Sequence, residues 1–198
     1  MKISIAIKIP YTLFAIILVP MYWKYYGPTN FLWISGFAML TTVVALWIEN
    51  RTIASMMMVS AFLPDTLWSI DYFWRLFLGS HLIGGTEYMF DLARPLYLRN
   101  ISLYHVFLPP ILLLMLVRLG YDKRALFYQT GLFWVICLTC YFFTDPEKNI
   151  NYVFGPFKPQ DTLHPLLYLA LLMGLTPLCV YYPLHRLLDR LFGDRPPP

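Results

Sequence analysis

A single histidine carries the clearest chemical signal in this sequence. His105 lies near the start of Ile101–Leu119, an apolar run with the length of a membrane-spanning helix. An ionisable side chain at that depth is costly and usually faces a bundle interior or a watery cavity. Pro109 cannot donate a helical hydrogen bond to the His105 carbonyl, and Pro110 lacks the same donor. An imidazole beside freed backbone acceptors indicates either a headgroup-level histidine or a catalytic or binding one.

Other polar residues are expected to share a layer with this histidine, on the side where the second, fourth and sixth predicted spans begin. His105 suits a general base, because an unperturbed imidazole has a pKa of about 6.5. Thr29 and Ser35 are the candidate nucleophiles, and Asp71 or Asp91 would orient the base. The candidate binding residues are Asn30, Trp33, Asp65, Asp71, Asn151 and His164. The asparagines, Asn149 included, would donate to an oxyanion.

Several of these residues have an alternative role that the sequence leaves open. Thr29 and Asn30 suit helix capping, because they follow a Gly–Pro pair. Asp71 has the helical spacing for an ion pair with Arg75. His164 directly precedes a proline and would also suit an interfacial cap.

Asp65 follows Pro64 in the middle of an apolar segment. A carboxylate buried there needs a partner. Alternatively, it marks the start of a new half-helix, whose N-terminus would stabilise the negative charge. The histidines are too far apart for the usual zinc motifs, and no Gly-rich phosphate loop is present, so the sequence predicts neither a metal nor a cofactor.

Composition places the chain in a membrane. Of its 198 residues, 59% are hydrophobic and 13% are charged, whereas soluble domains carry about 25% charged residues. Many of the 15 tyrosines and 6 tryptophans lie near segment ends, as in an interfacial belt. The net charge of +4 comes from scattered basic residues, which gives no indication of nucleic-acid binding.

We predict an all-α, polytopic membrane protein, a compact bundle of six transmembrane helices. The expected spans are Ile3–Trp23, Asn30–Ile48, Thr52–Phe73, Ile101–Leu119, Ala125–Phe143 and Leu163–Leu184. Residues 1–192 would form a single transmembrane domain, and residues 193–198, with three prolines, a frayed tail. The loops Gly79–Asn100 and Thr144–Thr162 are apolar enough to fold over the helix ends.

The distribution of basic residues predicts the orientation. Lys and Arg residues are more numerous on the side of the N-terminus, where Arg118, Lys123 and Arg124 form a tight cluster. The positive-inside rule then places both termini in the cytoplasm. The protein is expected in a bacterial inner membrane.

Two stretches resemble a known family. YGPTNFLWI at Tyr26–Ile34 and HVFLPPILLLM at His105–Met115 resemble segments of the androgen-induced and androgen-dependent membrane hydrolases, which cleave fatty-acid esters of hydroxy fatty acids. The chain also resembles uncharacterised bacterial multi-pass membrane proteins with a GPTNFLW stretch. The resemblance implies that His105 is the catalytic histidine. Trp33 stands where those hydrolases have their nucleophilic threonine, so the nucleophile here would be Thr29 or Ser35.

The expected function is therefore binding of a membrane lipid or fatty-acyl ligand in an outer-side cavity, with ester hydrolysis or acyl transfer as the candidate reaction. The alternative is a non-enzymatic membrane subunit or assembly module, whose partner would be another membrane protein or a second copy of the chain. A transporter built on the proline-interrupted spans is a third possibility, although no inverted repeat is evident.

Overall fold

The computed structural model describes residues 3–193, and over that range it is helical without any strand. The α-helices are α1 (Ile5–Tyr26), α2 (Ile34–Ile48), α3 (Arg51–Leu78), α4 (Leu96–Asn100), α5 (Tyr104–Leu119), α6 (Ala125–Phe143), α7 (Pro165–Thr176) and α8 (Tyr182–Phe192). The 3₁₀ turns are η1 (Pro28–Leu32), η2 (Glu87–Met89), η3 (Ile101–Leu103), η4 (Pro146–Lys148) and η5 (Ile150–Tyr152), and η6 (Pro177–Tyr181) is a π-helix. The all-α prediction is confirmed. The predicted tail lies outside the described residues except for Gly193.

Within residues 3–193, five helical runs are long and apolar enough to cross a membrane. They are Ile5–Tyr26, Arg51–Leu78, Leu96–Leu119, Ala125–Phe143 and Pro165–Phe192. The remaining predicted span, Asn30–Ile48, corresponds to the shorter α2, with 15 residues. It starts at Ile34 because the preceding residues, Pro28–Leu32, form a 3₁₀ turn. These apolar helices are consistent with an integral membrane protein.

Two predicted boundaries are wrong in a way that matters for the site. The predicted loop Gly79–Asn100 ends early, because α4, η3 and α5 form one near-continuous helical run. His105 consequently lies in the interior of the run Leu96–Leu119, not one turn from its end. The third span likewise extends past Phe73, and Gly79 ends it with a φ of 76°, which favours glycine.

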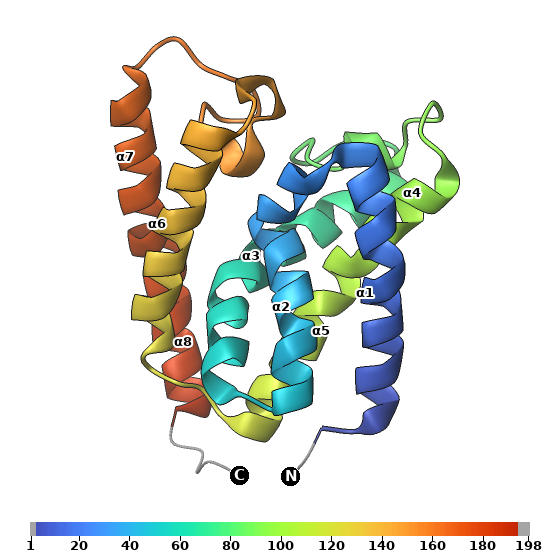
Figure 1. Ribbon diagram of the computed structural model, residues 1–198, viewed down its shortest axis with the longest axis vertical. Coiled ribbons are helices and arrows are strands. Elements are labelled where there is room, and N and C mark those ends of the chain that lie inside the picture. Colours follow the sequence, from blue (N-terminus) through green and yellow to red (C-terminus); the bar gives the residue numbers. More distant parts are fainter. Residues whose placement is uncertain (1–2, 194–198) are drawn as a thin grey trace.

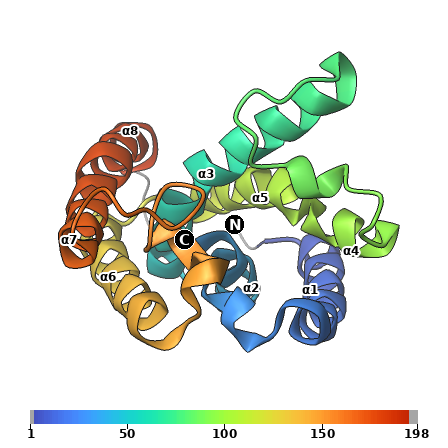
Figure 2. The ribbon, with the colours of Figure 1, turned by 90° about the horizontal axis from the view of Figure 1, so that it is seen from above.

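The helices are arranged around α3 (Figures 1 and 2). It packs against α2, α5 and α6, whereas α1 lies along the outer side of α2. Helices α6, α7 and α8 form a second group, and the far half of α3 diverges from them. We call the end where α1 begins and α8 finishes the basal end, and the opposite end the loop end.

The packed interior combines small side chains with large apolar ones such as Leu108, Met115 and Tyr181. Ala38, Ala54 and Ala61 are completely buried, which allows the helices to approach closely. Large apolar side chains also cover the outside: Ile16, Phe127 and Leu178 are at least 62% exposed. A surface so rich in exposed apolar side chains would be a liability in water and is ordinary against lipid.

Candidate functional site

A buried histidine–aspartate pair joins α5 to α3. His105 Nδ1 lies 2.8 Å from Asp65 Oδ1. The Asp65 side chain is 1% exposed and that of His105 is 11% exposed. Helix α3 continues through Pro64, so Asp65 does not begin a half-helix. Of the two roles that the sequence allowed for Asp65, the structure shows the buried carboxylate with a partner, His105.

The contact with Asp65 occupies Nδ1 of His105 and leaves Nε2 as the nitrogen that can meet a ligand. With Asp65 ionised, its carboxylate can only accept, which puts the proton on Nδ1 of His105 and makes Nε2 the acceptor of the neutral ring. No hydrogen bond to Nε2 from residues 3–193 accompanies the Nδ1 contact. Asp65 Oδ2 is likewise buried without a hydrogen-bond partner in that range. The pair therefore presents a basic nitrogen oriented by a carboxylate.

Two aromatic rings hold the imidazole between them. Trp68 stacks on His105 with ring centroids 4.5 Å apart and an angle of 24° between the planes. Tyr104 stacks on it at 4.1 Å and 28°. On its other side Trp68 stacks on Tyr72, at 5.5 Å and 10°. The ring orientation of His105 is thus set by packing as well as by the carboxylate.

The backbone carbonyl that Pro109 frees has a side-chain partner. Ser69 Oγ lies 3.1 Å from the His105 carbonyl oxygen and 2.8 Å from that of Asp65. Its hydroxyl donates to one of these acceptors at a time. Ser69 therefore replaces the missing helical donor and fixes α5 against α3 beside the pair.

Hydroxyl groups gather on the loop-end side of the pair. Ser35 Oγ lies 3.3 Å from the Tyr104 hydroxyl, and Tyr22 and Ser102 share a buried hydrogen bond of 2.9 Å. Of the two candidate nucleophiles, Ser35 thus contacts the hydroxyl of Tyr104, the tyrosine that stacks on His105. Thr29 instead accepts from Lys148 Nζ at 3.4 Å in the exposed loop region.

Neither of the two acids expected to orient the base does so. Asp71 accepts from the backbone N–H groups of Leu82, Ile83 and Gly84, and from both donors of Thr86. Asp91 is exposed and pairs with Arg94 at 3.3 Å. Arg75, the other predicted partner of Asp71, donates to the Gly79 carbonyl instead. Asp71 is a loop anchor in this structure.

The candidate oxyanion donors have other partners. Asn151 accepts from the Ile34 N–H at 2.9 Å and donates to the Leu32 carbonyl at 2.7 Å, so both amide atoms hold the start of α2. Asn149 accepts from Phe154 N and donates to the Gly155 carbonyl within its own loop.

The remaining predicted residues lie toward the helix ends. Asn30 lies in the 3₁₀ turn before α2, and Trp33 directly precedes that helix. The Trp33 ring meets Tyr152 edge-on at 5.4 Å. His164 is exposed at the start of α7. No hydrogen bond within residues 3–193 connects any of these three side chains to His105.

Three residues of the site were not singled out from the sequence: Trp68, Ser69 and Tyr104. A usable signal exists for the first two. Trp68 and Ser69 lie three and four positions after Asp65, so all three occupy one face of a helix. Tyr104 precedes His105 directly, and adjacent positions on a helix do not normally share a face, which hides it from such a search.

An apolar groove follows the other side of α3. Its volume is about 480 Å³, and it is lined by Thr66, Ser69, Ile70, Phe73, Trp74, Phe77 and Leu78. Ser69 is common to the groove and to the environment of the pair. The groove thus begins one side chain away from His105.

Comparisons with known proteins add no relative. No protein-family model, no curated protein and no solved structure matches the chain. The proposals below therefore depend on the geometry of the chain itself.

Proposed function

We propose that this chain is an integral protein of a bacterial inner membrane that binds a lipid or fatty-acyl ligand and uses His105 as a general base in ester hydrolysis or acyl transfer. The observation that supports this most directly is the 2.8 Å contact between His105 Nδ1 and Asp65. A carboxylate at Nδ1 keeps the other nitrogen basic and oriented, which is the arrangement that base catalysis needs. In this proposal α2 completes a bundle of six spans.

The proposed chemistry takes place at Nε2 of His105. This nitrogen would accept the proton of a hydroxyl or water that attacks the ester carbonyl, and the imidazolium formed would be stabilised by Asp65. The same proton would then pass to the departing alkoxide, which leaves as an alcohol. Ser35 is the candidate protein nucleophile, because its hydroxyl lies 3.3 Å from the hydroxyl of Tyr104, whose ring stacks on the base.

The surroundings of the pair favour an apolar ligand over a soluble one. The groove along α3 is almost entirely apolar and opens on the outside of the bundle. In a bilayer that surface would meet acyl chains directly. Ser69 at one edge of the groove would bring a chain bound there close to the pair.

The function is tested by replacing the base. His105→Gln keeps a polar side chain but removes the basic nitrogen. We expect hydrolysis of a long-chain fatty-acid ester by the protein in proteoliposomes to fall on the order of 10²- to 10⁴-fold, the usual contribution of a general base. His164→Gln, at an exposed histidine, is the matched control and should hydrolyse the ester normally. Equal rates for the two variants would contradict a catalytic role.

The proposed orientation has its own test. Both termini in the cytoplasm would place Lys148, an exposed residue of η4 at the loop end, on the outer side. In a chain with its three native cysteines replaced by alanine, Lys148→Cys should react with a membrane-impermeant maleimide in intact spheroplasts. The control is Lys123→Cys at the basal end, which should react only after permeabilisation. The reverse pattern would invert the orientation.

A further inference from the structure

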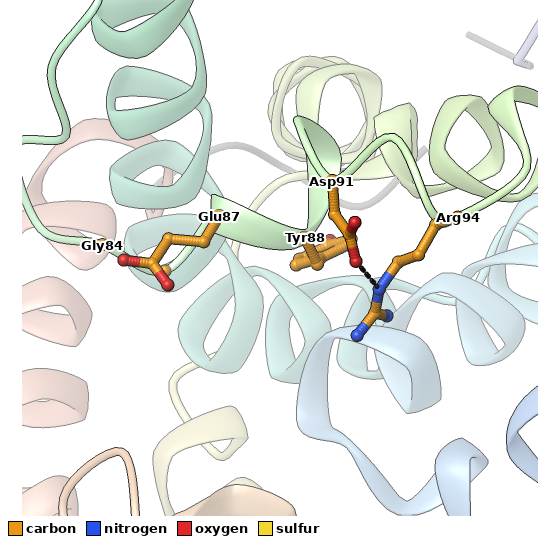
Figure 3. Close-up of a pocket in the computed structure, with 6 residues that line it drawn as sticks. Gly84, Glu87, Tyr88, Asp91 and Arg94 are labelled. Atoms are coloured by element: carbon orange, nitrogen blue, oxygen red, sulfur yellow. Dashed lines mark hydrogen bonds and ion pairs between the residues drawn. The ribbon is translucent and has the colours of Figure 1, made fainter.

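A second hollow lies at the loop end of the bundle, outside the groove of α3 (Figure 3). Its volume is about 460 Å³, and it is lined by Gly84, Gly85, Glu87, Tyr88, Asp91 and Arg94. All six residues come from the segment between α3 and α4. We call this hollow the loop-end pocket.

The walls of the loop-end pocket are held in place by charged side chains. Asp71 binds the N–H of Gly84 at 3.2 Å and that of Thr86 at 3.1 Å, which fixes one wall to α3. Asp91 holds the guanidinium of Arg94 on the other wall, and Arg94 also donates to the Tyr26 hydroxyl at 3.4 Å. The pocket is thus shaped before any ligand arrives.

Charges of both signs border the pocket. Glu87 is exposed and forms no ion pair with any residue between 3 and 193, whereas Arg94 is paired with Asp91. Glu87 and Arg94 project on opposite sides of Tyr88 (Figure 3). With two carboxylates and one guanidinium, the pocket suits a ligand that carries an ammonium group and a phosphate, and it disfavours one that is only anionic.

Tyr88 connects the loop-end pocket with the histidine–aspartate pair. The guanidinium of Arg94 lies over its ring at 5.7 Å. The same ring is 6.4 Å from that of Trp68, which stacks on His105 at 4.5 Å. Burial raises the pKa of Tyr88 to about 12, although hydrogen bonds with the Ser102 and Trp68 side chains act to lower it. The phenol therefore stays protonated at neutral pH. Only two aromatic side chains separate the pocket from the base.

The surroundings of the pocket match the membrane interface. Leu92 is 89% exposed and Leu96 is 61% exposed, and both belong to the segment that forms or follows the pocket wall. Leu82 and Ile83, which directly precede the lining residue Gly84, are also about half exposed. Exposed leucines before and after the charged lining residues in the sequence are typical of a segment that inserts among lipid headgroups.

We propose that the loop-end pocket binds the zwitterionic headgroup of phosphatidylethanolamine, with the ammonium at Glu87 and the phosphate at Arg94. This inference rests on the proposed function and names its lipid class: the ester region of such a lipid would lie toward Trp68 and His105. A primary ammonium donates hydrogen bonds to a carboxylate, which a choline headgroup does not. A phosphatidylglycerol headgroup would bring only negative charge to Glu87 and Asp91.

The test measures headgroup preference directly. The purified protein is placed in nanodiscs that contain equal amounts of phosphatidylethanolamine and phosphatidylglycerol with the same acyl chains, and the lipids retained after detergent extraction are counted by native mass spectrometry. We expect retained phosphatidylethanolamine to exceed phosphatidylglycerol about threefold, a modest factor because Glu87 is exposed to solvent. Glu87→Gln should abolish this preference, and Arg94→Gln should lower retention of both lipids.

Matched substitutions in the other loop provide the controls. Glu147→Gln and Lys158→Gln change exposed charges outside the pocket and should keep the preference. Equal retention of the two lipids by the native protein, or an unchanged preference in Glu87→Gln, would overturn the proposal. So would complete displacement of the lipid by soluble phosphoethanolamine, because the ligand would then be a free solute.

The two proposals fail separately in this experiment. His105→Gln should keep the headgroup preference, because the imidazole does not line the loop-end pocket. Loss of headgroup preference in Glu87→Gln together with normal ester hydrolysis by His105→Gln would support headgroup binding in the pocket and contradict the role of His105 as a base. A normal catalytic dependence on His105 with no headgroup preference would do the opposite.

Discussion

Replacing Asp65 with asparagine is expected to abolish turnover while the bundle stays folded. Asparagine has nearly the shape of aspartate, so the buried space beside His105 stays filled. Its amide group, however, can donate to Nδ1, which favours the tautomer with the proton on Nε2. That tautomer has no acceptor left for the proton of a nucleophile. In serine proteases the equivalent change lowers kcat about 10⁴-fold, and we expect a loss on the order of 10³- to 10⁴-fold.

The double variant separates catalysis from structure. If Asp65 acts through His105, Asp65→Asn combined with His105→Gln should be no slower than His105→Gln alone, because members of one catalytic unit are strongly non-additive. The melting temperature of each variant in detergent is measured alongside ester hydrolysis. Multiplicative losses in rate, or a large drop in melting temperature without a selective loss of rate, would show that the carboxylate supports the bundle and not the base.

Much of the helical framework could be predicted from the apolar runs, because a helix in lipid needs about 20 apolar residues and little else. The start of α2 could not. Its first free N–H, at Ile34, is bound by the side chain of Asn151, more than 100 residues further along the chain. No local pattern reports such a contact. Asn151 was therefore predicted as a ligand-binding residue, and the structure gives it a capping role.

The sequence predicted one member of the candidate site and not its partner, again because the contact between them is not local. The cost of placing an imidazole in lipid singled out His105. Its partner depends on the register of α5 against α3, which composition does not specify. Asp71 had the right chemistry and the right helix, but it lies six residues beyond Asp65 and faces the loop that it anchors. Because the fourth helical run begins at Leu96, His105 lies in its interior, level with Asp65 on α3.

Asp71→Ala is expected to release the segment between α3 and α4. The carboxylate accepts from four backbone N–H groups and from the Thr86 hydroxyl, and the residue is 1% exposed. A buried donor left without a partner costs about 1 to 3 kcal/mol. The segment lies at the end of the bundle, so its released N–H groups near Leu82 and Ile83 can turn to water. We therefore expect a loss of about 2 to 4 kcal/mol, less than the sum of the separate bonds.

Hydrogen exchange locates that loss. Amide protection in Asp71→Ala should fall mainly between Leu82 and Arg94, while the interior of α5 stays protected. Asp145→Ala is the matched control, because Asp145 caps η4 through a single exposed contact with the Glu147 N–H. The loop-end pocket includes Gly84, whose N–H Asp71 holds, so the headgroup preference should vanish in Asp71→Ala even though Glu87 and Arg94 are intact. Retained preference with a loosened segment would mean that the lipid itself orders the pocket, and Asp71 would then affect stability alone.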